Sequence, residues 1–164
     1  MNDNYAVING KKIELTEKQI KALGFEVRKN PFLKVAVDNM YYFISHFGDI
    51  DRYRQAKDLE DDMLFNNINY FNDEYFANQV ALHQLLYRKL LKYAYDNEFE
   101  DEEWNGTNMH AYIIYNFTRK DYDIRWTRNE KEPGTVYFKT PTRATAALNE
   151  VVMPFVKEHP EFVW

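Results

Sequence analysis

The segment from residue 73 to residue 97 constrains the fold more strongly than any other part of this chain. Its apolar residues recur at steps of three and four, the spacing that places side chains on one face of an α-helix. Asn72 precedes the segment and suits the N-cap position, because its side chain can accept a hydrogen bond from the first helical turn. We expect a long helix whose buried face is formed by Phe76, Val80, His83, Tyr87, Leu90 and Ala94 and widened by Leu82, Leu86 and Tyr93.

Two aromatic residues, Tyr70 and Phe71, stand just before this helix and could form either a stacking platform or the start of a core. The same pair returns as Tyr137 and Phe138 before a second helical segment. A shift of 67 residues lays "YFNDEYFANQVAL" over "YFKTPTRATAALN". Because packing explains a pair that precedes two helices, we expect Phe71, Phe76 and Phe138 to lie in the core.

Alternating patterns ahead of both helices predict antiparallel hairpins. Residues 34–53 are interpreted as two strands joined at Phe47-Gly48-Asp49, with Tyr41, Phe43 and Ile50 toward a core. Residues 109–129 form a second predicted hairpin that turns at "TRK", and "TVYF" at 135–138 adds a short strand. The polar segment "RQAKDLEDDMLFNN" between the first hairpin and the long helix is interpreted as a loop.

The second helix is expected to begin after Thr140, which suits the N-cap, with Pro141 at the first helical position. Pro154 has no amide hydrogen to donate, so we expect the helix to kink or end there. The chain after it should return as a tail held by Phe162 and Trp164.

The N-terminal segment predicts a smaller unit. "YAVINGKKIEL" alternates across Asn9-Gly10, a dipeptide suited to a type I′ hairpin turn. Thr16 and Gln19 have the spacing of a capping box, and Gly24 suits a helix stop. The short helix between them should bury Ile20 and Leu23.

Together these elements predict an α+β protein with two related β-β-β-α halves, in which antiparallel strands pack on helices, preceded by a small β-β-α element. The expected boundaries are 1–30 for the N-terminal hairpin and short helix, 31–100 for the first half with the long helix, and 101–164 for the second half with the C-terminal helix and tail. With 164 residues and 45% hydrophobic content, the chain can bury a core, and we expect one compact unit.

The overall charge favours protein partners. A net charge of −5 means that the molecule as a whole repels the phosphate backbone of nucleic acids. The absence of cysteine excludes disulfides, thiolate catalysis and cysteine-ligated zinc. No stretch approaches the roughly 18 apolar residues needed to span a bilayer. We expect a soluble cytoplasmic protein.

No motif in the sequence indicates a particular chemistry. The local signatures of acyl transfer, nucleotide hydrolysis, dinucleotide binding and zinc deamination do not occur. The run "DLEDDM" is rich in carboxylates but lacks the glycine and terminal glutamate of a calcium loop. We expect His83 to be structural and the protein to need no metal and no cofactor. The four histidines have no metal-ligand spacing: His46, His83, His110 and His159.

Acidic segments supply the candidates for partner binding. Residues 96–104 contain six acids and no base, interleaved with Phe99 and Trp104, and such a surface can steer a protein with a basic groove into contact. A solvated loop is the alternative interpretation. Tyr75, which aligns with Thr142 in the shifted comparison, is the ring left for a binding surface. The acidic candidates, with their neighbouring ring, are Asp58, Glu60, Asp61, Asp62, Glu98, Glu100, Asp101, Glu102, Glu103 and Trp104.

A basic segment supplies a second set of candidates. Residues 119–143 hold seven bases and four acids. Alternation should place Tyr122, Ile124 and Trp126 on one face of a strand and the charged residues on the other. A basic strand pair beside an aromatic ring is typical of nucleic-acid surfaces, although the admixed acids also fit an ordinary solvated surface. The nucleic-acid candidates are Arg119, Lys120, Arg125, Trp126 and Arg128.

Several segments of the chain resemble a family of small proteins encoded by phages and prophages of Firmicutes. They are "INGKKIELTEKQIKALG", "YYFISHFGDID", "NNINYFNDEYFANQVALHQLLYRKLLKYA" and "GTVYFKTPTRATAALNEVVMPFVKEHPEFVW". The resemblance covers most of the chain and is weakest in the acidic linkers. Its motifs are structural, and most such relatives have no assigned activity. Some small proteins of this kind are anti-CRISPR proteins, so the resemblance implies an anti-defence role without site residues to transfer.

Three functional hypotheses follow. The leading one is a non-enzymatic inhibitor of a bacterial defence system, an anti-CRISPR that acts in the host cytoplasm. It would bind a Cas nuclease effector through its acidic surface and block DNA binding or cleavage. The second is a nucleic-acid-binding accessory protein of a phage, and the third is an enzyme with a carboxylate-bound metal. The sequence leaves the target, the blocked step and the oligomeric state open.

Overall fold

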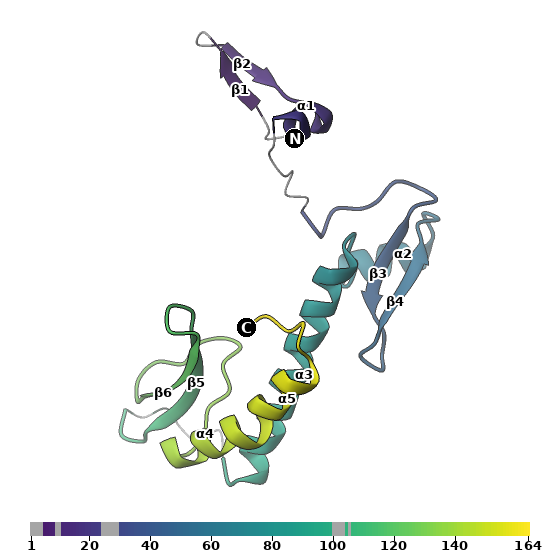
Figure 1. Ribbon diagram of the computed structural model, residues 1–164. Helices are drawn as coiled ribbons and strands as arrows, with labels where there is room; N and C mark the ends of the chain where they lie inside the picture. The colour runs from purple at the N-terminus through teal and green to yellow at the C-terminus, as the bar shows by residue number, and fades with distance from the viewer. Residues whose placement is uncertain (1–4, 9–10, 24–29, 100–103, 105) are drawn as a thin grey trace.

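The structure of the chain is a computed structural model that describes residues 5–8, 11–23, 30–99, 104 and 106–164. Helices and antiparallel strands both occur, so the protein is α+β. The strands in the described part of the chain form three two-stranded hairpins, β1–β2, β3–β4 and β5–β6. Figure 1 shows β3–β4 beside the N-terminal part of the long helix α3 (Glu74–Asp96), whereas β5–β6 lies toward its other end.

The N-terminal unit has the predicted order of a hairpin and a short helix. Strand β1 (Tyr5–Ile8) pairs antiparallel with β2 (Lys11–Glu14), and the expected turn at Asn9-Gly10 lies outside the described residues. Helix α1 (Glu17–Ala22) follows.

The capping box predicted for α1 is present. The backbone N–H of Thr16 donates to Gln19 Oε1 (2.8 Å), and the N–H of Gln19 donates to Thr16 Oγ1 (3.4 Å). Ile20 is buried as expected. The predicted burial of Leu23 is wrong, because this residue follows the last residue of α1 and its side chain is exposed.

The first central hairpin confirms the predicted strands. β3 (Met40–Ile44) pairs antiparallel with β4 (Ile50–Arg54). The turn is closed by the N–H of Ser45, which donates to the carbonyl of Asp49 (2.8 Å), and Gly48 adopts a left-handed φ of 95° there. Of the three side chains expected in the core, Tyr41 is fully buried and Phe43 and Ile50 are half-buried.

The acidic segment after this hairpin is a helix, α2 (Leu59–Asn66), so the loop interpretation was wrong. Asp58 is its N-cap and accepts a hydrogen bond from the N–H of Asp61 (3.0 Å). The Asp61 carboxylate in turn accepts from the N–H of Asp58 (3.2 Å). Two aspartates therefore form a reciprocal capping box, which nucleates a helix that has little apolar periodicity.

Helix α3 begins one residue later than predicted. Its N-cap is Asp73, which accepts a hydrogen bond from the N–H of Phe76 (2.8 Å). Asn72 does not cap the helix, because its amide group donates to the carbonyls of Asn30 (2.9 Å) and Leu33 (3.0 Å). Asn72 therefore connects the segment at residues 30–33 to the start of α3.

The buried face of α3 is confirmed in part. Leu82, Leu86, Leu90 and Ala94 are buried as predicted, whereas His83 and Tyr87, expected on the same face, are exposed. Two alanines that were not predicted, Ala77 and Ala81, complete the face, because small residues allow close packing. The buried residues are Ala77, Ala81, Leu82, Leu86, Leu90 and Ala94.

The second central hairpin is also as predicted. β5 (His110–Asn116) pairs antiparallel with β6 (Asp121–Thr127) across residues 117–120. Helix α4 (Pro141–Ala147) begins at Thr140, whose hydroxyl accepts from the N–H of Arg143 (3.2 Å).

The C-terminal helix continues through Pro154, so of the predicted kink or end, the end does not occur. A π-helical segment, η1 (Leu148–Val152), separates α4 from α5 (Met153–Glu158). The wider turn comes directly before the proline, whose ring would otherwise crowd the carbonyl four residues back.

The two Tyr-Phe pairs occupy corresponding places. Phe71 forms a single antiparallel bridge to Tyr42 of β3, and Phe138 forms one to Ala111 of β5. The expected short strand at residues 135–138 is therefore reduced to one bridge. Both phenylalanines are buried, which confirms the packing interpretation for them, and Phe76 is half-buried against Phe71 and Phe32.

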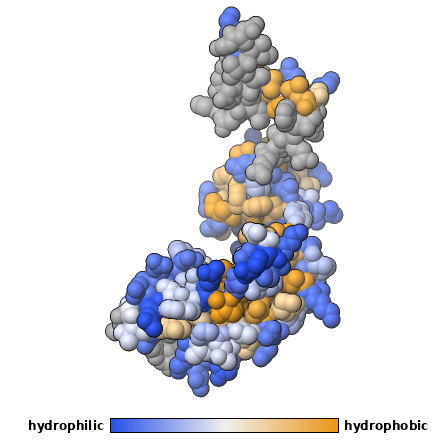
Figure 2. Space-filling view, turned by 60° about the vertical axis from the view of Figure 1, so that its left-hand side comes forward, coloured by the Kyte–Doolittle hydropathy of each residue, from blue (hydrophilic) through white to orange (hydrophobic). Residues whose placement is uncertain are grey.

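The C-terminal tail is held as predicted. Phe162 packs on Phe155 and His83, with ring centroids 5.3 and 4.8 Å apart, and Trp164 packs on Tyr122 at 5.2 Å. These rings border the larger core cluster, in which the C-terminal part of α3, from Leu82 to Ala94, packs against β5, α4, η1 and α5. Figure 2 shows apolar residues gathered on the face where these elements lie.

Candidate functional site

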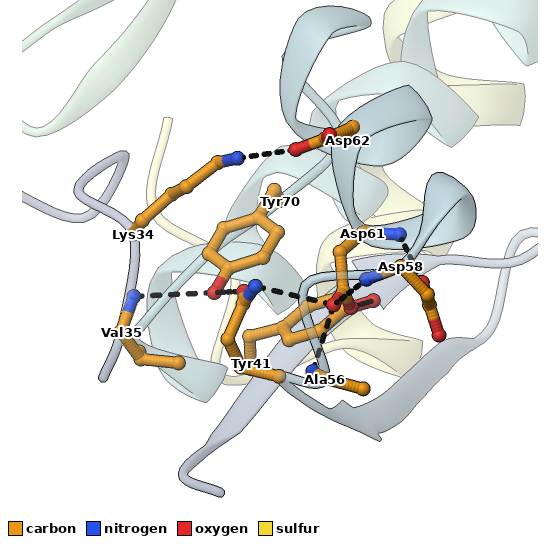
Figure 3. A network of polar contacts seen from close by, with 9 residues as sticks. Lys34, Val35, Tyr41, Ala56, Asp58, Asp61, Asp62 and Tyr70 are labelled. Atoms are coloured by element: carbon orange, nitrogen blue, oxygen red, sulfur yellow. Dashed lines mark hydrogen bonds and ion pairs between the residues drawn. The ribbon is translucent and has the colours of Figure 1, made fainter. Parts of the chain in front are cut away.

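A buried carboxylate organises the first central region. Asp61 is 0% exposed, and its side chain accepts hydrogen bonds from the Tyr41 hydroxyl (2.8 Å), the Gln55 amide (3.1 Å) and the N–H of Ala56 (2.8 Å). Tyr70 extends this network. Figure 3 shows Tyr41 of β3 and the backbone N–H groups of Ala56, after β4, and of Asp58, at the start of α2, converging on the carboxylate. The Tyr70 hydroxyl instead donates to Gln55.

The ionised state of Asp61 is the stable one. Burial acts to raise the pKa of its carboxyl, but the hydrogen bonds from Tyr41 and from the backbone outweigh burial and leave the pKa below its usual value. Burial and the hydrogen bond to Asp61 raise the pKa of Tyr41. These shifts favour a neutral phenol that donates to a carboxylate.

Helix α2 separates its acidic residues into inner and outer groups. Asp61 faces inward, and its carboxylate oxygens accept hydrogen bonds from within the protein. The prediction that Asp61 belongs to an acidic binding surface is therefore wrong, because the residue is buried. Asp62 lies outside and pairs with Lys34 (2.6 Å), and Glu60 is exposed. The most exposed apolar side chains on the helix are Leu59 (76%) and Met63 (57%), one turn apart. The outer surface thus combines negative charge with apolar side chains.

The second acidic segment is described only at its ends. Glu98 is exposed and lies 3.9 Å from Lys139, a distant ion pair. Glu100, Asp101, Glu102 and Glu103 lie outside the described residues. Trp104 is half-buried and stacks on His110, with ring centroids 3.9 Å apart, so this ring contributes to packing.

Tyr75 is 59% exposed near the start of α3, in agreement with its selection as a ring free of the core. The basic candidates are also on the surface, but their charges are partly neutralised. Arg119 donates to Asp121 (3.1 Å) and Asp123 (2.5 Å), and these hydrogen bonds raise the pKa of Arg119 and lower that of Asp123.

Of the remaining basic candidates, Arg128 lies over an exposed ring, that of Trp126. Trp126 is 54% exposed, whereas Tyr122 and Ile124, expected on the same face of β6, are half-buried. The guanidinium of Arg128 lies over the ring of Trp126, 5.5 Å from its centroid. Lys120 is exposed in the turn, and Arg125 is 3.8 Å from Asp123.

The described residues contain no group of three or more histidine, aspartate or glutamate side chains placed to hold a metal ion. None of the helices within these described ranges is long and apolar enough to cross a membrane. Comparison with protein-family models, curated proteins and solved structures finds no significant match to this chain.

Sequence reasoning missed a hollow under the β3–β4 turn. It has a volume of about 720 Å³, and its lining includes His46, Phe47, Ile68 and Arg88. These residues come from three separate segments, and none belongs to a motif. Arg88 gave no signal, because it is one of several basic residues on α3 and has no distinguishing neighbours in the sequence.

Proposed function

We propose that this chain is a non-enzymatic, phage- or prophage-encoded inhibitor of a bacterial defence system. The leading target is a Cas nuclease effector, whose DNA binding or cleavage the protein would block by occupying a basic surface. The proposal takes its target class from the family resemblance and its mode of binding from the structure. We place the contact surface on the outer side of α2.

The observation that carries this proposal is the exposure of Leu59 and Met63 beside Glu60. Large apolar side chains on a helix surface are typical of contact sites, and neighbouring acids select a basic partner. The buried Asp61 fixes the helix from beneath, so little ordering entropy is lost on binding. A rigid acidic and apolar face suits recognition of a groove built for nucleic acid.

A cleavage assay with purified Cas effectors tests the proposal. We expect the protein to inhibit at least one effector. Two substitutions, Glu60→Lys and Met63→Glu, should each weaken that inhibition about tenfold, as a loss of about 1.4 kcal/mol would. Glu130→Lys makes the same change of charge on an exposed residue of the other region and should leave inhibition unchanged. The proposal fails if no effector is inhibited and affinity capture from host lysate retains no defence protein.

The two central regions support a finer interpretation of the fold. We propose that they descend from one β-β-β-α unit, with the third strand shortened to the bridges of Phe71 and Phe138. Both bridges precede a side-chain-capped helix, at Asp73 and Thr140. In that case the conserved plan is the joint between hairpin and helix, and α2 is an insertion available for a specific partner.

A second candidate function is nucleic-acid binding, and the exposed pair of Trp126 and Arg128 favours it. An aromatic ring with a guanidinium over it can stack on a base and contact a phosphate. We expect Trp126→Ala to abolish a gel shift with single-stranded DNA at low salt if this function is correct. Absence of a shift from the unaltered protein at low salt would eliminate it.

A further inference from the structure

The hollow under the β3–β4 turn has fixed walls. Asn69 holds the end of β3 from two sides: its Oδ1 accepts from the N–H of Ile44 (2.9 Å), and its Nδ2 donates to the Ile44 carbonyl (2.8 Å). The bridge between Tyr42 and Phe71 closes the next position with two hydrogen bonds of 2.8 Å. The hollow is therefore a formed feature and does not depend on a partner to shape it.

The lining of this hollow is cationic and amide-rich. Arg88 of α3 is exposed and has no ion pair with any described residue. Gln84, one turn earlier, and Asn67 add exposed amide groups, and no acidic side chain belongs to the lining. In a protein with a net charge of −5, this is a local positive charge, which would attract a negatively charged group.

Large apolar side chains stand at the rim. Phe47 is 81% exposed with the ring of His46 against it, 3.9 Å between centroids, and Ile68 is 64% exposed. A segment that places a carboxylate on Arg88 can therefore bury apolar side chains on Phe47 and Ile68 at the same time.

Ile68 is also held in an unfavourable backbone conformation. Its φ is 56°, in the left-handed region that a β-branched residue rarely adopts. The flanking hydrogen bonds, from the N–H of Ile68 to Phe65 (3.1 Å) and from the N–H of Asn69 to Leu64 (2.9 Å), impose this geometry. Folding does not require isoleucine here, because the side chain is neither buried nor suited to the backbone. Such strain is characteristic of binding surfaces.

The second central region shows what can cover a hollow of this kind. A smaller hollow of about 360 Å³ lies between the end of β5, the segment before the Phe138 bridge, and α3. One of its walls is the chain's own tail, through Phe162 and Trp164. The side chain of Gln79 makes two hydrogen bonds to the backbone of that tail. It donates to the Glu161 carbonyl (2.9 Å) and accepts from the N–H of Val163 (2.9 Å), as a neighbouring strand would. No described segment forms the corresponding wall of the first hollow.

We propose that the first hollow binds an extended segment of a partner protein that carries a carboxylate beside an aromatic or large aliphatic side chain. The carboxylate pairs with Arg88, the apolar side chain packs on Phe47 and Ile68, and Gln84 binds the segment's backbone. This site lies apart from the outer face of α2 and has the opposite charge preference. It therefore stands or falls independently of the proposed inhibition.

The chain's own tail supplies a probe with this chemistry, because residues 159–164, "HPEFVW", combine an acid with aromatic residues. An N-acetylated peptide of this sequence is titrated into the ¹⁵N-labelled full chain. We expect saturable shifts of the amide signals of Gly48, Ile68 and the Gln84 side chain. An amidated control peptide with lysine in place of glutamate should bind at least tenfold more weakly.

Matched variants locate the site. Arg88→Gln should weaken peptide binding about fivefold, the effect expected when an exposed ion pair is lost. Lys89→Gln removes the same charge from the adjacent exposed position and should leave binding unchanged. Both side chains are on the surface, so unaltered spectra away from the hollow will verify that the variants fold.

Four results would overturn the proposal. They are the absence of saturable shifts, equal binding of the two peptides, an equal effect of the two variants, and shifts restricted to residues around the second hollow. Tighter binding of inorganic phosphate than of the peptide would instead make the hollow a simple anion site. Shifts that depend on protein concentration without peptide would assign it to a second copy of the chain.

Discussion

The two central regions place the same Tyr-Phe pair before a helix but support it with different interiors. The hydroxyls of Tyr70 and Tyr137 both accept a backbone hydrogen bond, from Val35 (3.1 Å) and Glu132 (2.8 Å) respectively. Tyr70 also donates to Gln55 (2.6 Å) and so belongs to the network of the buried aspartate. The hydroxyl of Tyr70 thus makes two hydrogen bonds, of which the one to Gln55 is buried.

Around Tyr137 the neighbours are rings. Trp104 packs edge-on to it at 4.9 Å and Tyr112 at 5.4 Å between centroids. The comparison shows that one joint between hairpin and helix tolerates either a polar or an aromatic interior. The polar interior depends on the geometry of each hydrogen bond, so single substitutions should affect it more severely than the aromatic one.

Of the substitutions that test this difference between the two regions, Asp61→Ala should destabilise the protein most. It leaves Tyr41, Gln55 and two backbone N–H groups without their buried acceptor, and we expect a loss of about 3–5 kcal/mol of unfolding free energy. Hydrogen exchange should accelerate in β3 and β4 more than in β5 and β6, because the first region does not contribute to the larger core cluster. Urea unfolding and exchange measured by NMR give both quantities.

Asp62→Ala is the matched control, because it removes a neighbouring carboxylate whose ion pair with Lys34 is exposed. We expect a change of about 1 kcal/mol or less. Equal losses for the two variants would show that the buried network has no special weight in the first region.

The second prediction compares the two tyrosines directly. Tyr70→Phe leaves the Gln55 oxygen and the Val35 N–H unpaired and should cost about 2–3 kcal/mol. Tyr137→Phe leaves only the N–H of Glu132, in a partly buried site, and should cost about 1 kcal/mol. Urea midpoints of the two variants give the comparison, and a greater cost at Tyr137 would reverse it.

The third prediction uses acid pH. The pKa of Asp61 is lowered on folding, so its contribution to stability is present above the unfolded pKa of about 3.9 and is lost as pH falls through the folded pKa. The β3 and β4 amides should therefore lose protection below about pH 4 before those of β5 and β6. In Asp61→Asn this difference between the regions should disappear. If the amides of β5 and β6 lose protection from hydrogen exchange first, Asp61 is not the group that makes the protein sensitive to acid.

Alkaline pH does not separate the regions in this way. Burial raises the pKa of Tyr41 and Tyr70 in the first region and of Tyr93, Tyr112 and Tyr122 in the second. A raised pKa gives stability that is present below the unfolded value of about 10 and is lost as pH rises. Both regions should therefore weaken together above about pH 10.

Much of the fold followed from local patterns. Alternation predicted both central hairpins, and Thr140 and Pro141 predicted the start of α4, because these signals depend on neighbouring residues alone. Helix α2 was missed because its capping box is made of two aspartates and its inward side is a carboxylate. The face of α3 was predicted in part: Leu82, Leu86, Leu90 and Ala94 were expected there, whereas Ala77 and Ala81 were not, because small residues add little to an apolar pattern.

The candidate sites were less predictable. Exposed acids such as Glu60 could be selected from charge alone. Asp61 stands between two exposed residues and is distinguished from them by partners that include Ala56 and Tyr41, 5 and 20 positions away. The hollow at Arg88 depends on the pairing of β3 with Phe71, and the left-handed conformation of Ile68 depends on the end of α2. Long-range pairing of this kind leaves no periodic signal in one sequence.

The smallest expected effect concerns the segments that lead into the two Tyr-Phe pairs. The second segment has a glycine, Gly134, at its left-handed position (φ 78°), whereas the first has Ile68 (φ 56°). Asparagine tolerates this conformation, so Ile68→Asn should increase the unfolding free energy by about 1 kcal/mol. The same variant should bind the acidic peptide more weakly, because the apolar rim is lost. A thermal melt and one titration measure both effects. A substitution that stabilises the fold and weakens binding would show that the isoleucine serves recognition, whereas a destabilising result would assign it to the fold.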